Sequence, residues 1–275
     1  MRPTSLITST ANPKIKLARK LRERKERQES GLAYIEGLRI VIEAAQHGAA
    51  IQTLLLAPHL LSSEKGRSIA EDLLNRGAEV LEVSDEVFKS LALKDDPQGI
   101  AAIVSQSWQR LDEVHLQTGE VWVALEAVAD PGNLGTILRT CDGVGAKGVI
   151  LLDNSTDPYD PTAMRASMGA LFTQKLVKSS FETFSTWKTA QKIPLVGTSG
   201  AAKNDYHSFQ YPGLFILFMG NERHGLSEKA MTLCDQVVRI PMHGQSDSLN
   251  LAVATAVVLY EIYNHQRDAI GEKKG

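Results

Sequence analysis

With 275 residues, the chain fits two modest α/β domains better than one, and each would be large enough to bury a core of ordinary size. No apolar run approaches the roughly 18 to 20 residues that cross a bilayer, and the N-terminus lacks the apolar stretch of a signal peptide, so we expect a cytoplasmic protein with no membrane partner. A net charge of −2 excludes a uniformly basic nucleic-acid binder and leaves room for a local basic surface.

The two cysteines, Cys141 and Cys234, lie far apart in the sequence, without CxxC spacing or a neighbouring histidine pattern. This arrangement argues against a disulfide framework and against a zinc site. We therefore expect two reduced, buried thiols and no metal.

A basic segment begins close to the N-terminus. Asn12 and Pro13 have the pattern of an N-cap followed by proline at the first helical position, which predicts a helix that ends near Gly31. The stretch 14–27 contains eight basic residues against two acidic ones, a local excess of six positive charges. Such density favours phosphate binding, although a solvated helix face has the same pattern.

Helical and strand-like patterns alternate through the rest of the N-terminal half. Apolar residues recur at helical spacing from Leu38 to Ala45, and Gly48 ends that helix. Strands are predicted at 51–56, 79–83 and 100–104, and helices at 69–74 and 86–91. Residues 1–107 are therefore expected to form a compact α/β sandwich.

Residues 108–118 are polar and lack clear periodicity, which indicates a linker to a second domain at 119–275. Strands of this second domain are predicted at 121–126, 149–152, 195–198, 215–219 and 237–240. Helical patterns separate most of these strands, and strands separated by helices favour a parallel sheet.

Gly143, Gly145 and Gly148 satisfy the GxGxxG pattern of dinucleotide-binding domains. That fingerprint requires a strand before the glycines and a helix after them, because the helix N-terminus must face the phosphates. Here the order is reversed, with a helical stripe before the glycines and a strand-like run after them. The glycines are therefore expected to end a helix and turn into a strand.

Three polar segments of the second domain carry candidate chemistry. In the first, Asn133 is a candidate N-cap, and Arg139 lies off the apolar stripe that runs from Leu134 to Cys141. We therefore expect an exposed guanidinium. A capped helix with a surface arginine would have the same sequence.

The second segment follows an apolar strand. Gly220 and Gly225 would let backbone groups approach a ligand closely, and Glu222 lies between them. A carboxylate at the end of a buried strand usually has a partner or a task. The alternative interpretation is a turn that leads into a helix.

In the third segment, Ser248 and Asn250 precede a helix that continues to about His265. This helix is apolar almost all round, so every side of it must be buried. A subunit interface meets that condition more easily than the core of one small domain, which predicts a homodimer through the second domain.

Taken in order, these segments resemble the SpoU, or TrmH-like, branch of the SPOUT RNA methyltransferase superfamily over roughly residues 121–265. The matching blocks are N-x-G-x-x-x-R-T at 133–140, M-G-N-E-x-x-G-L at 219–226, and I-P-M-x-G at 240–244 followed by S-L-N at 248–250. The stretch 157–170 also resembles a loop of the family.

The resemblance implies an α/β domain with a deep trefoil knot that binds S-adenosylmethionine and methylates a ribose 2′-hydroxyl without a metal. It implies these catalytic residues: Arg139, Asn133, Glu222, Ser248 and Asn250. It implies these cofactor-binding residues: Thr198, Gly220, Asn221, Gly225, Ile240, Met242 and Leu249. The family assigns proton handling to the arginine at position 139. A guanidinium is effectively never deprotonated in proteins, so stabilisation of an alkoxide or of a phosphate stays open as its role.

The N-terminal half is similar to the L30e-like substrate-binding domain of many rRNA-modifying enzymes, at 36–39 and 95–99. This similarity strengthens the prediction of phosphate contacts for the basic segment. The expected RNA-binding residues are Lys14, Lys16, Arg19, Lys20, Arg39 and Arg165.

A separate N-terminal domain favours rRNA of the 23S type as the substrate. Transfer RNA is the alternative substrate within this enzyme class. A non-catalytic RNA-binding protein of ribosome assembly is the alternative from another class, and the intact set of implied catalytic residues argues against it.

Overall fold

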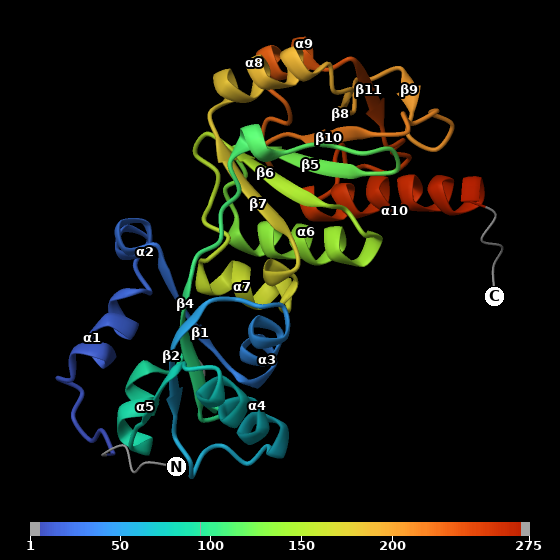
Figure 1. Cartoon of the computed structure of the whole chain (residues 1–275). Helices are drawn as coiled ribbons and strands as arrows, with labels where there is room; N and C mark the ends of the chain where they lie inside the picture. The colour runs from blue at the N-terminus through green and yellow to red at the C-terminus, as the bar shows by residue number, and fades with distance from the viewer. Residues whose placement is uncertain (1–5, 94, 271–275) are drawn as a thin grey trace. The chain divides into compact units, whose positions relative to one another are not determined.

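The computed structural model describes residues 6–93 and 95–270 (Figure 1). The chain forms two compact units. The first contains the described residues up to Ser107 together with Asp157–Thr173, and the second contains Trp108–Thr156 and the described residues from Gln174 onward. The segment Asp157–Thr173, expected within the second domain, thus belongs to the first unit. Within the described residues, no helix is both long enough and apolar enough to span a membrane.

The first unit is built on a four-stranded sheet. Its strands are Leu32–Glu36 (β1), Ile51–Leu56 (β2), Glu79–Glu82 (β3) and Ile100–Ser105 (β4), in the order β1-β4-β2-β3. Strand β4 is antiparallel to β1 and β2, and β2 is parallel to β3. The helices are Pro13–Lys20 (α1), Arg24–Ser30 (α2), Leu38–Gln46 (α3), Glu64–Asn75 (α4), Asp85–Leu91 (α5) and Pro161–Ser167 (α7), and a short 3₁₀ turn follows at Ala170–Phe172 (η2).

The helix expected from Pro13 to Gly31 is wrong as a single element, because the chain breaks between α1 and α2. Glu23 has extended backbone, and the guanidinium of Arg22 donates hydrogen bonds to the carbonyls of Leu91 and Ala92. These tertiary contacts outweigh the local helical pattern. Gly31 does end α2, in the left-handed conformation, and strand β1, which we did not predict, follows it directly.

Arg27 differs from the other basic residues of this segment, because its side chain is only 1% exposed. Its Nε atom donates a hydrogen bond to Asp157 Oδ2 at 2.7 Å, and its Nη1 atom donates to the carbonyls of Leu21 and Arg22. A buried charge needs such partners. Arg27 therefore attaches the segment Asp157–Thr173 to the first unit and is not part of a basic surface.

The second unit is built on a seven-stranded sheet. Its strands are Val121–Glu126 (β5), Gly148–Leu152 (β6), Lys175–Ser179 (β7), Leu195–Thr198 (β8), Asn204–Asp205 (β9), Phe215–Met219 (β10) and Gln236–Arg239 (β11). Its helices are Pro131–Val144 (α6), Phe181–Gln191 (α8), Glu228–Leu233 (α9) and Leu251–Ile270 (α10), with a 3₁₀ turn at Leu111–Glu113 (η1). The strand order is β7-β6-β5-β10-β8-β11-β9, and every neighbouring pair is parallel. The predicted parallel sheet is therefore confirmed.

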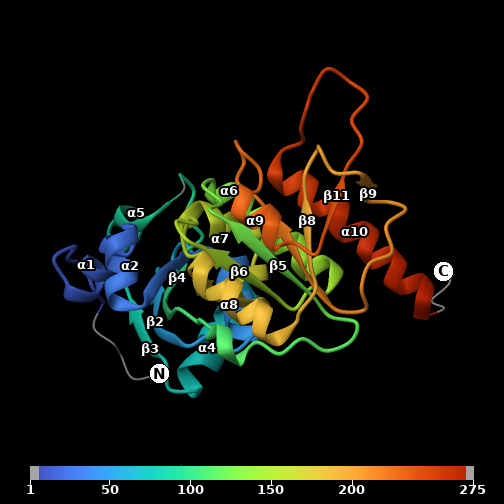
Figure 2. The same ribbon diagram turned by 90° about the horizontal axis from the view of Figure 1, so that it is seen from above.

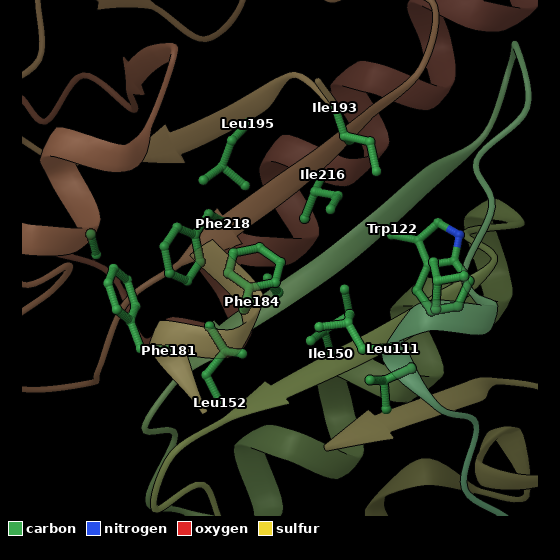
Figure 3. Packing of buried hydrophobic residues seen from close by; sticks show 14 residues of the cluster. Leu111, Trp122, Ile150, Leu152, Phe181, Phe184, Ile193, Leu195, Ile216 and Phe218 are labelled. Carbon is green, nitrogen blue, oxygen red and sulfur yellow. The ribbon is translucent and has the colours of Figure 1, made fainter. Parts of the chain in front are cut away.

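Helices cover both faces of this sheet, with α8 and α9 on one side and α6 and α10 on the other (Figure 1). Under α8, a buried cluster joins Phe184 and Phe181 to Phe218, Ile150 and Trp122 of the strands (Figure 3). On the other side, the stripe Leu134, Ile137, Leu138 and Cys141 of α6 is fully buried, as its spacing predicted. Apolar residues on both sides of successive strands explain the nearly continuous apolar runs in the sequence.

The GxGxxG stretch has the structure expected from its context. Gly145 has φ 72° and ends α6, and β6 begins at Gly148. The two cysteines are free, but only Cys141 is buried, whereas Cys234 is partly exposed. Burial raises the pKa of both thiols to about 12.

Strand order gives this unit a defined ligand-binding edge. From β5 the chain adds β6 and β7 on one side, and it then returns to build β8, β10 and β11 on the other, so that β10 lies beside β5. In open parallel sheets, ligands bind outside the carboxyl ends of the strands at such a reversal point. The loops after β5 and β10 are therefore where a site is expected.

Candidate functional site

The loops that follow β5 and β10 are joined through the carboxylate of Glu222. Its oxygens accept hydrogen bonds from the backbone amides of Ala129, at 3.1 and 3.2 Å, and of Asp130, at 3.0 Å. They also accept from the side-chain amides of Asn133, at 3.3 Å, and Asn221, at 3.4 Å. Glu222 thus has the partners that a carboxylate at the end of a buried strand was expected to have.

These hydrogen bonds decide the charge state of Glu222. Burial raises the pKa of this carboxyl, but the donors from Asp130, Ala129 and Asn133 outweigh burial and lower the pKa below its usual value. Glu222 is therefore an anion at neutral pH. It acts as an acceptor for the turn before α6.

Asn133 connects Glu222 to the third polar segment. Its Nδ2 atom donates to Glu222, and its Oδ1 atom accepts from Asn250 Nδ2 at 2.9 Å. Asn250 in turn caps α10, because its Oδ1 atom accepts from the amides of Ala252 and Val253. One residue from each of the three polar segments thus joins a single hydrogen-bonded chain.

The expectation that Asn133 is the N-cap of its helix is wrong. The cap is Asp130, whose Oδ1 atom accepts from the amide of Asn133 at 2.7 Å, and Pro131 holds the first helical position. Asn133 lies in the first turn, where its side chain is available for Glu222 and Asn250.

The loop after β10 folds back on itself. The backbones of Asn221 and Gly225 exchange two hydrogen bonds of 2.9 Å, and Asn221 Nδ2 donates to the carbonyl of Ala127 at 2.8 Å. A Cβ atom on Gly220 would lie 2.0 Å from the backbone carbon of Gly225. Only glycine fits at position 220, because its backbone passes directly against the returning loop.

A cavity of about 400 Å³ lies against this loop. It is lined by all seven residues expected to bind the cofactor: Thr198, Gly220, Asn221, Gly225, Ile240, Met242 and Leu249. Ser248 lines it as well, so the loop before α10 forms one wall. Figure 2 shows this loop standing out between β11 and α10.

The cavity suits S-adenosylmethionine by size and by surface. Its volume lies in the range of about 300 to 1,000 Å³ that is typical of ligand sites. Its lining combines apolar residues such as Leu226 and Ile240 with the polar residues Thr198 and Ser248. In the described part of the chain, this cavity included, no group of three or more His, Cys, Asp or Glu side chains is placed to hold a metal ion.

A second cavity, of about 660 Å³, shares the loop 221–225 with the first. It adds Glu126, Asp130, Asp153 and Ser227 to the site, none of which the sequence analysis named as site residues. Glu126 accepts from the amide and the hydroxyl of Ser227 at 2.8 and 2.6 Å. The signal for Glu126 was present in the sequence, since it is another carboxylate at the end of a buried strand.

Arg139 is exposed on α6, as predicted, but it lines neither cavity. The structure of one chain therefore brings together Asn133, Glu222, Ser248 and Asn250, and it leaves Arg139 apart from them.

The expected RNA-binding residues all lie in the first unit. Lys16, Arg19, Lys20, Arg39 and Arg165 are exposed. Lys14 is partly buried and forms an ion pair of 2.8 Å with Glu79. Five of the six are thus open to solvent, and both Lys14 and Lys20 already have acidic partners, since Lys20 forms an ion pair of 3.3 Å with Glu26.

Comparisons with known proteins match both halves of the chain. A model of the SpoU rRNA Methylase family matches residues 120–260, and a model described as an MRM3-like substrate binding domain matches residues 12–102.

Relatives match over nearly the full length. The chain is 32% identical to a 23S rRNA (uridine(2479)-2'-O)-methyltransferase of Streptomyces viridochromogenes, over 88% of this chain and 85% of that protein. It is 28% identical to a 23S rRNA (guanosine(2553)-2'-O)-methyltransferase of Bacillus subtilis, over 93% and 98%. The crystal structure of an AdoMet-bound rRNA methyltransferase from Sinorhizobium meliloti is similar with a TM-score of 0.86 and 38% identity, covering 94% of this chain and 97% of that one.

Proposed function

The chain belongs to the SpoU rRNA methylase family, and from this premise we propose that it transfers a methyl group from S-adenosylmethionine to a ribose 2′-hydroxyl of ribosomal RNA. It is a methyltransferase that uses S-adenosylmethionine as its cofactor. The observation that carries this function is the chain of hydrogen bonds from Glu222 through Asn133 to Asn250, beside a cavity of suitable size.

Large-subunit RNA of the 23S type is the proposed substrate class. The named relatives act on 23S rRNA, and a substrate-binding domain model matches the N-terminal half. Because ribosomal RNA is the substrate, the proposed location is the cytoplasm.

In the proposed mechanism, the bound cofactor supplies an electrophilic methyl group. Glu222 keeps the loops after β5 and β10 in register, and Asn133 and Asn250 fix the start of α10 against them. Ser248 lines the cavity from the loop before α10, and the residues around Gly220 hold the cofactor through backbone groups. Alignment of the two reacting groups is the main contribution of such a scaffold.

Arg139 is proposed to stabilise the ribose oxygen as it loses its proton, or to hold the neighbouring phosphate. A guanidinium stays protonated in proteins, which favours these roles over that of a base. Because Arg139 lines neither cavity of its own chain, its role depends on the RNA or a second chain bringing the ribose to it.

A homodimer through the second unit is also proposed. Val253 and Tyr260 are each 49% exposed, although they lie on a mainly apolar helix. They stand seven positions apart in α10, which places them on one face of the helix. Helix α10 packs against α6, so a dimer formed there would involve the surface that carries Arg139.

Two finer features of the fold are proposed from family membership. One is a deep trefoil knot in the C-terminal part of the second unit, which the SpoU family membership implies. The other is an L30e-like topology of the first unit, supported by its mixed four-stranded sheet with flanking helices.

The test is methyl transfer from radiolabelled S-adenosylmethionine to protein-free ribosomal RNA and, separately, to bulk tRNA. Incorporation into 23S-type RNA, mapped as a 2′-O-methyl group by its resistance to alkaline cleavage, is the expected result. Incorporation into tRNA alone would favour the tRNA alternative. If the chain did not bind the cofactor, the result would favour the alternative of a non-catalytic RNA-binding protein.

A further inference from the structure

The second cavity, of about 660 Å³, adjoins the cavity proposed for the cofactor and has no ligand assigned to it above. Its walls are formed by the loops after β5, β6 and β10, all within the second unit. Typical ligand sites measure about 300 to 1,000 Å³, so this cavity is large enough for one nucleotide.

Two residues with strained backbone line this cavity. Ala127 and Asp153 have φ values of 51° and 52°, in the left-handed region that residues other than glycine rarely adopt. Each directly follows the last residue of a strand, and neither ends a helix. The carbonyl of Ala127 accepts from Asn221 Nδ2, and Asp153 Oδ1 accepts from the amide of Phe181 at 2.9 Å. Strain that neighbouring contacts hold in this way is concentrated at functional sites.

The two cavities share one wall, the loop 221–225. Asn221 and Gly225 close this loop through their two backbone hydrogen bonds, and Asn221 Oδ1 accepts from the amide of Arg223 at 2.9 Å. The tip of the loop, which contains Arg223 and His224, is therefore held in place before a ligand binds. Both tip residues line both cavities, and both are exposed.

The guanidinium of Arg223 makes no hydrogen bond or ion pair among the described residues. The nearby carboxylates of Glu222 and Glu126 are already engaged, because both oxygens of each accept from other donors. A guanidinium presents a planar fork of donors that fits a phosphate. The family pattern did not indicate this residue, since it stands at the first variable position of M-G-N-E-x-x-G-L.

The chemistry of RNA decides which phosphate would lie at this shared wall. In a ribose, the 2′-hydroxyl and the 3′-phosphate are attached to neighbouring carbon atoms. The 2′-hydroxyl must meet the cofactor where the two cavities adjoin. A nucleotide in the second cavity would therefore bring its 3′-phosphate close to a cation on the shared wall.

We propose that the second cavity receives the target nucleotide of the RNA and that Arg223 holds the 3′-phosphate of this nucleotide. The proposal rests on the proposed function, because it assumes that a 2′-hydroxyl accepts the methyl group. It also gives two arginines different tasks. Since Arg223 holds the phosphate, stabilisation of the ribose oxygen is the role left to Arg139.

Steady-state kinetics of full-length variants on protein-free ribosomal RNA test the phosphate contact. A contact that is equally strong in the ground state and the transition state changes KM and leaves kcat unchanged. Arg223→Ala should therefore raise KM for RNA about ten-fold, through loss of a charged hydrogen bond, and change kcat by less than about three-fold. The slope of log affinity against log salt should fall by about 0.7, the value for one phosphate of single-stranded RNA.

Two further variants separate charge from geometry. Arg223→Lys keeps the positive charge and loses the planar fork, so it should keep the wild-type salt slope while KM stays raised. Lys178→Ala removes an exposed cation of β7 that lines neither cavity, and it is the matched control. It should change KM by less than about two-fold.

A substitution that fills the second cavity tests its occupant. Ala129 is exposed and lines the second cavity but not the first, so Ala129→Phe should narrow the second without disturbing the core. KM for RNA should rise about ten-fold, the size expected when one base loses its contacts. The cofactor dissociation constant and the melting temperature should be unchanged. Ala190→Phe, at an exposed alanine of α8, is the control for the added ring.

The outcomes distinguish this proposal from the proposed function. A wild-type KM for RNA in both Arg223→Ala and Ala129→Phe would overturn the proposal and leave the function standing. Loss of cofactor affinity in Arg223→Ala, with an unchanged KM for RNA, would also overturn the proposal, because the guanidinium would then bind the carboxylate of the cofactor. Failure of the unmodified protein to methylate any RNA would overturn the proposed function, and this proposal with it.

Discussion

Glu222 is the residue whose environment the structure defines most fully. Three donors, the backbone amides of Ala129 and Asp130 and the side-chain amide of Asn133, make four hydrogen bonds to its carboxylate. A fifth comes from its neighbour Asn221. Because these hydrogen bonds favour the ionised carboxylate, the free energy of unfolding depends on whether Glu222 is ionised.

Glu222→Gln should therefore lower the melting temperature in a pH-dependent way. The pKa of Glu222 is lower in the folded protein than its ordinary value of 4.5, so the carboxylate stabilises the fold fully above pH 4.5. That stabilisation is lost as the pH falls through the folded-state pKa. The difference in melting temperature between wild type and variant should be constant from pH 6 to 8 and should shrink below pH 4.5, as measured by calorimetry. A difference that grows at acid pH would contradict this assignment.

Arg139 is exposed and outside both cavities, so its substitution should separate catalysis from folding. Arg139→Ala should lower kcat by about 10²- to 10³-fold, as loss of one electrostatic stabiliser does. The free energy of unfolding should change by less than about 0.5 kcal/mol, and cofactor affinity should be unchanged. Arg139→Lys should also be slow, because lysine lacks the planar fork of donors. An alanine variant within ten-fold of the wild-type rate would disprove the role.

At the scale of elements, α1 and α2 divide the basic segment into two kinds of residue. Arg27 is buried and holds Asp157, and Lys14 is paired with Glu79, whereas Lys16, Arg19 and Lys20 are exposed on α1. Local charge density alone could not separate these groups, because the partners of Arg27 and Lys14 lie far along the chain. The three exposed residues can reach phosphate, although Lys20 also forms an ion pair of 3.3 Å with Glu26.

Reversing Lys16, Arg19 and Lys20 to glutamate should weaken RNA binding and make it less sensitive to salt. If each residue contacts one phosphate, the slope of log affinity against log salt should fall by about two for single-stranded RNA. Reversal of Lys65, Arg67 and Arg76, which are exposed on or at the end of α4, makes the same charge change in the same unit and is the control. Cofactor affinity should be unchanged in both variants. Equal loss of RNA affinity in the two would mean that only net charge matters.

At the scale of the whole molecule, the dimer proposal concerns the exposed side of α10, and only a substitution on that side can test it. The helix has its buried side against α6, where Val258 is 0% exposed, and an outer side that includes Val253 and Tyr260. A charge at Val258 would disrupt the core of the chain itself, so it cannot report on association.

The double variant Val253→Glu and Tyr260→Glu should dissociate the proposed dimer while leaving each chain folded. Stable interfaces bury about 1,200 Å² or more, and two carboxylates within such an apolar area oppose association. Sedimentation of the unmodified protein at low micromolar concentration should give twice the mass of 30.0 kDa, and the double variant should give 30.0 kDa with unchanged circular dichroism. A fully active unmodified monomer would refute the dimer.

Local patterns in the sequence determined the elements and much of the site. Apolar periodicity placed β5, β6, β8, β10 and β11 of the second unit and the buried stripe of α6, because a side chain's spacing decides which face it occupies. It did not predict β7 or β9. The second and third polar blocks identified residues that line one cavity, and Asn133 of the first block is hydrogen-bonded to both, because all three blocks meet at the same edge of a parallel sheet.

Contacts between distant residues decided the remainder. The break between α1 and α2 and the placement of Asp157–Thr173 in the first unit both depend on partners that sequence spacing does not reveal. A sequence shows which side chains need a partner, and only the tertiary fold shows which partner each one has, as it does for Arg27 and Asp157.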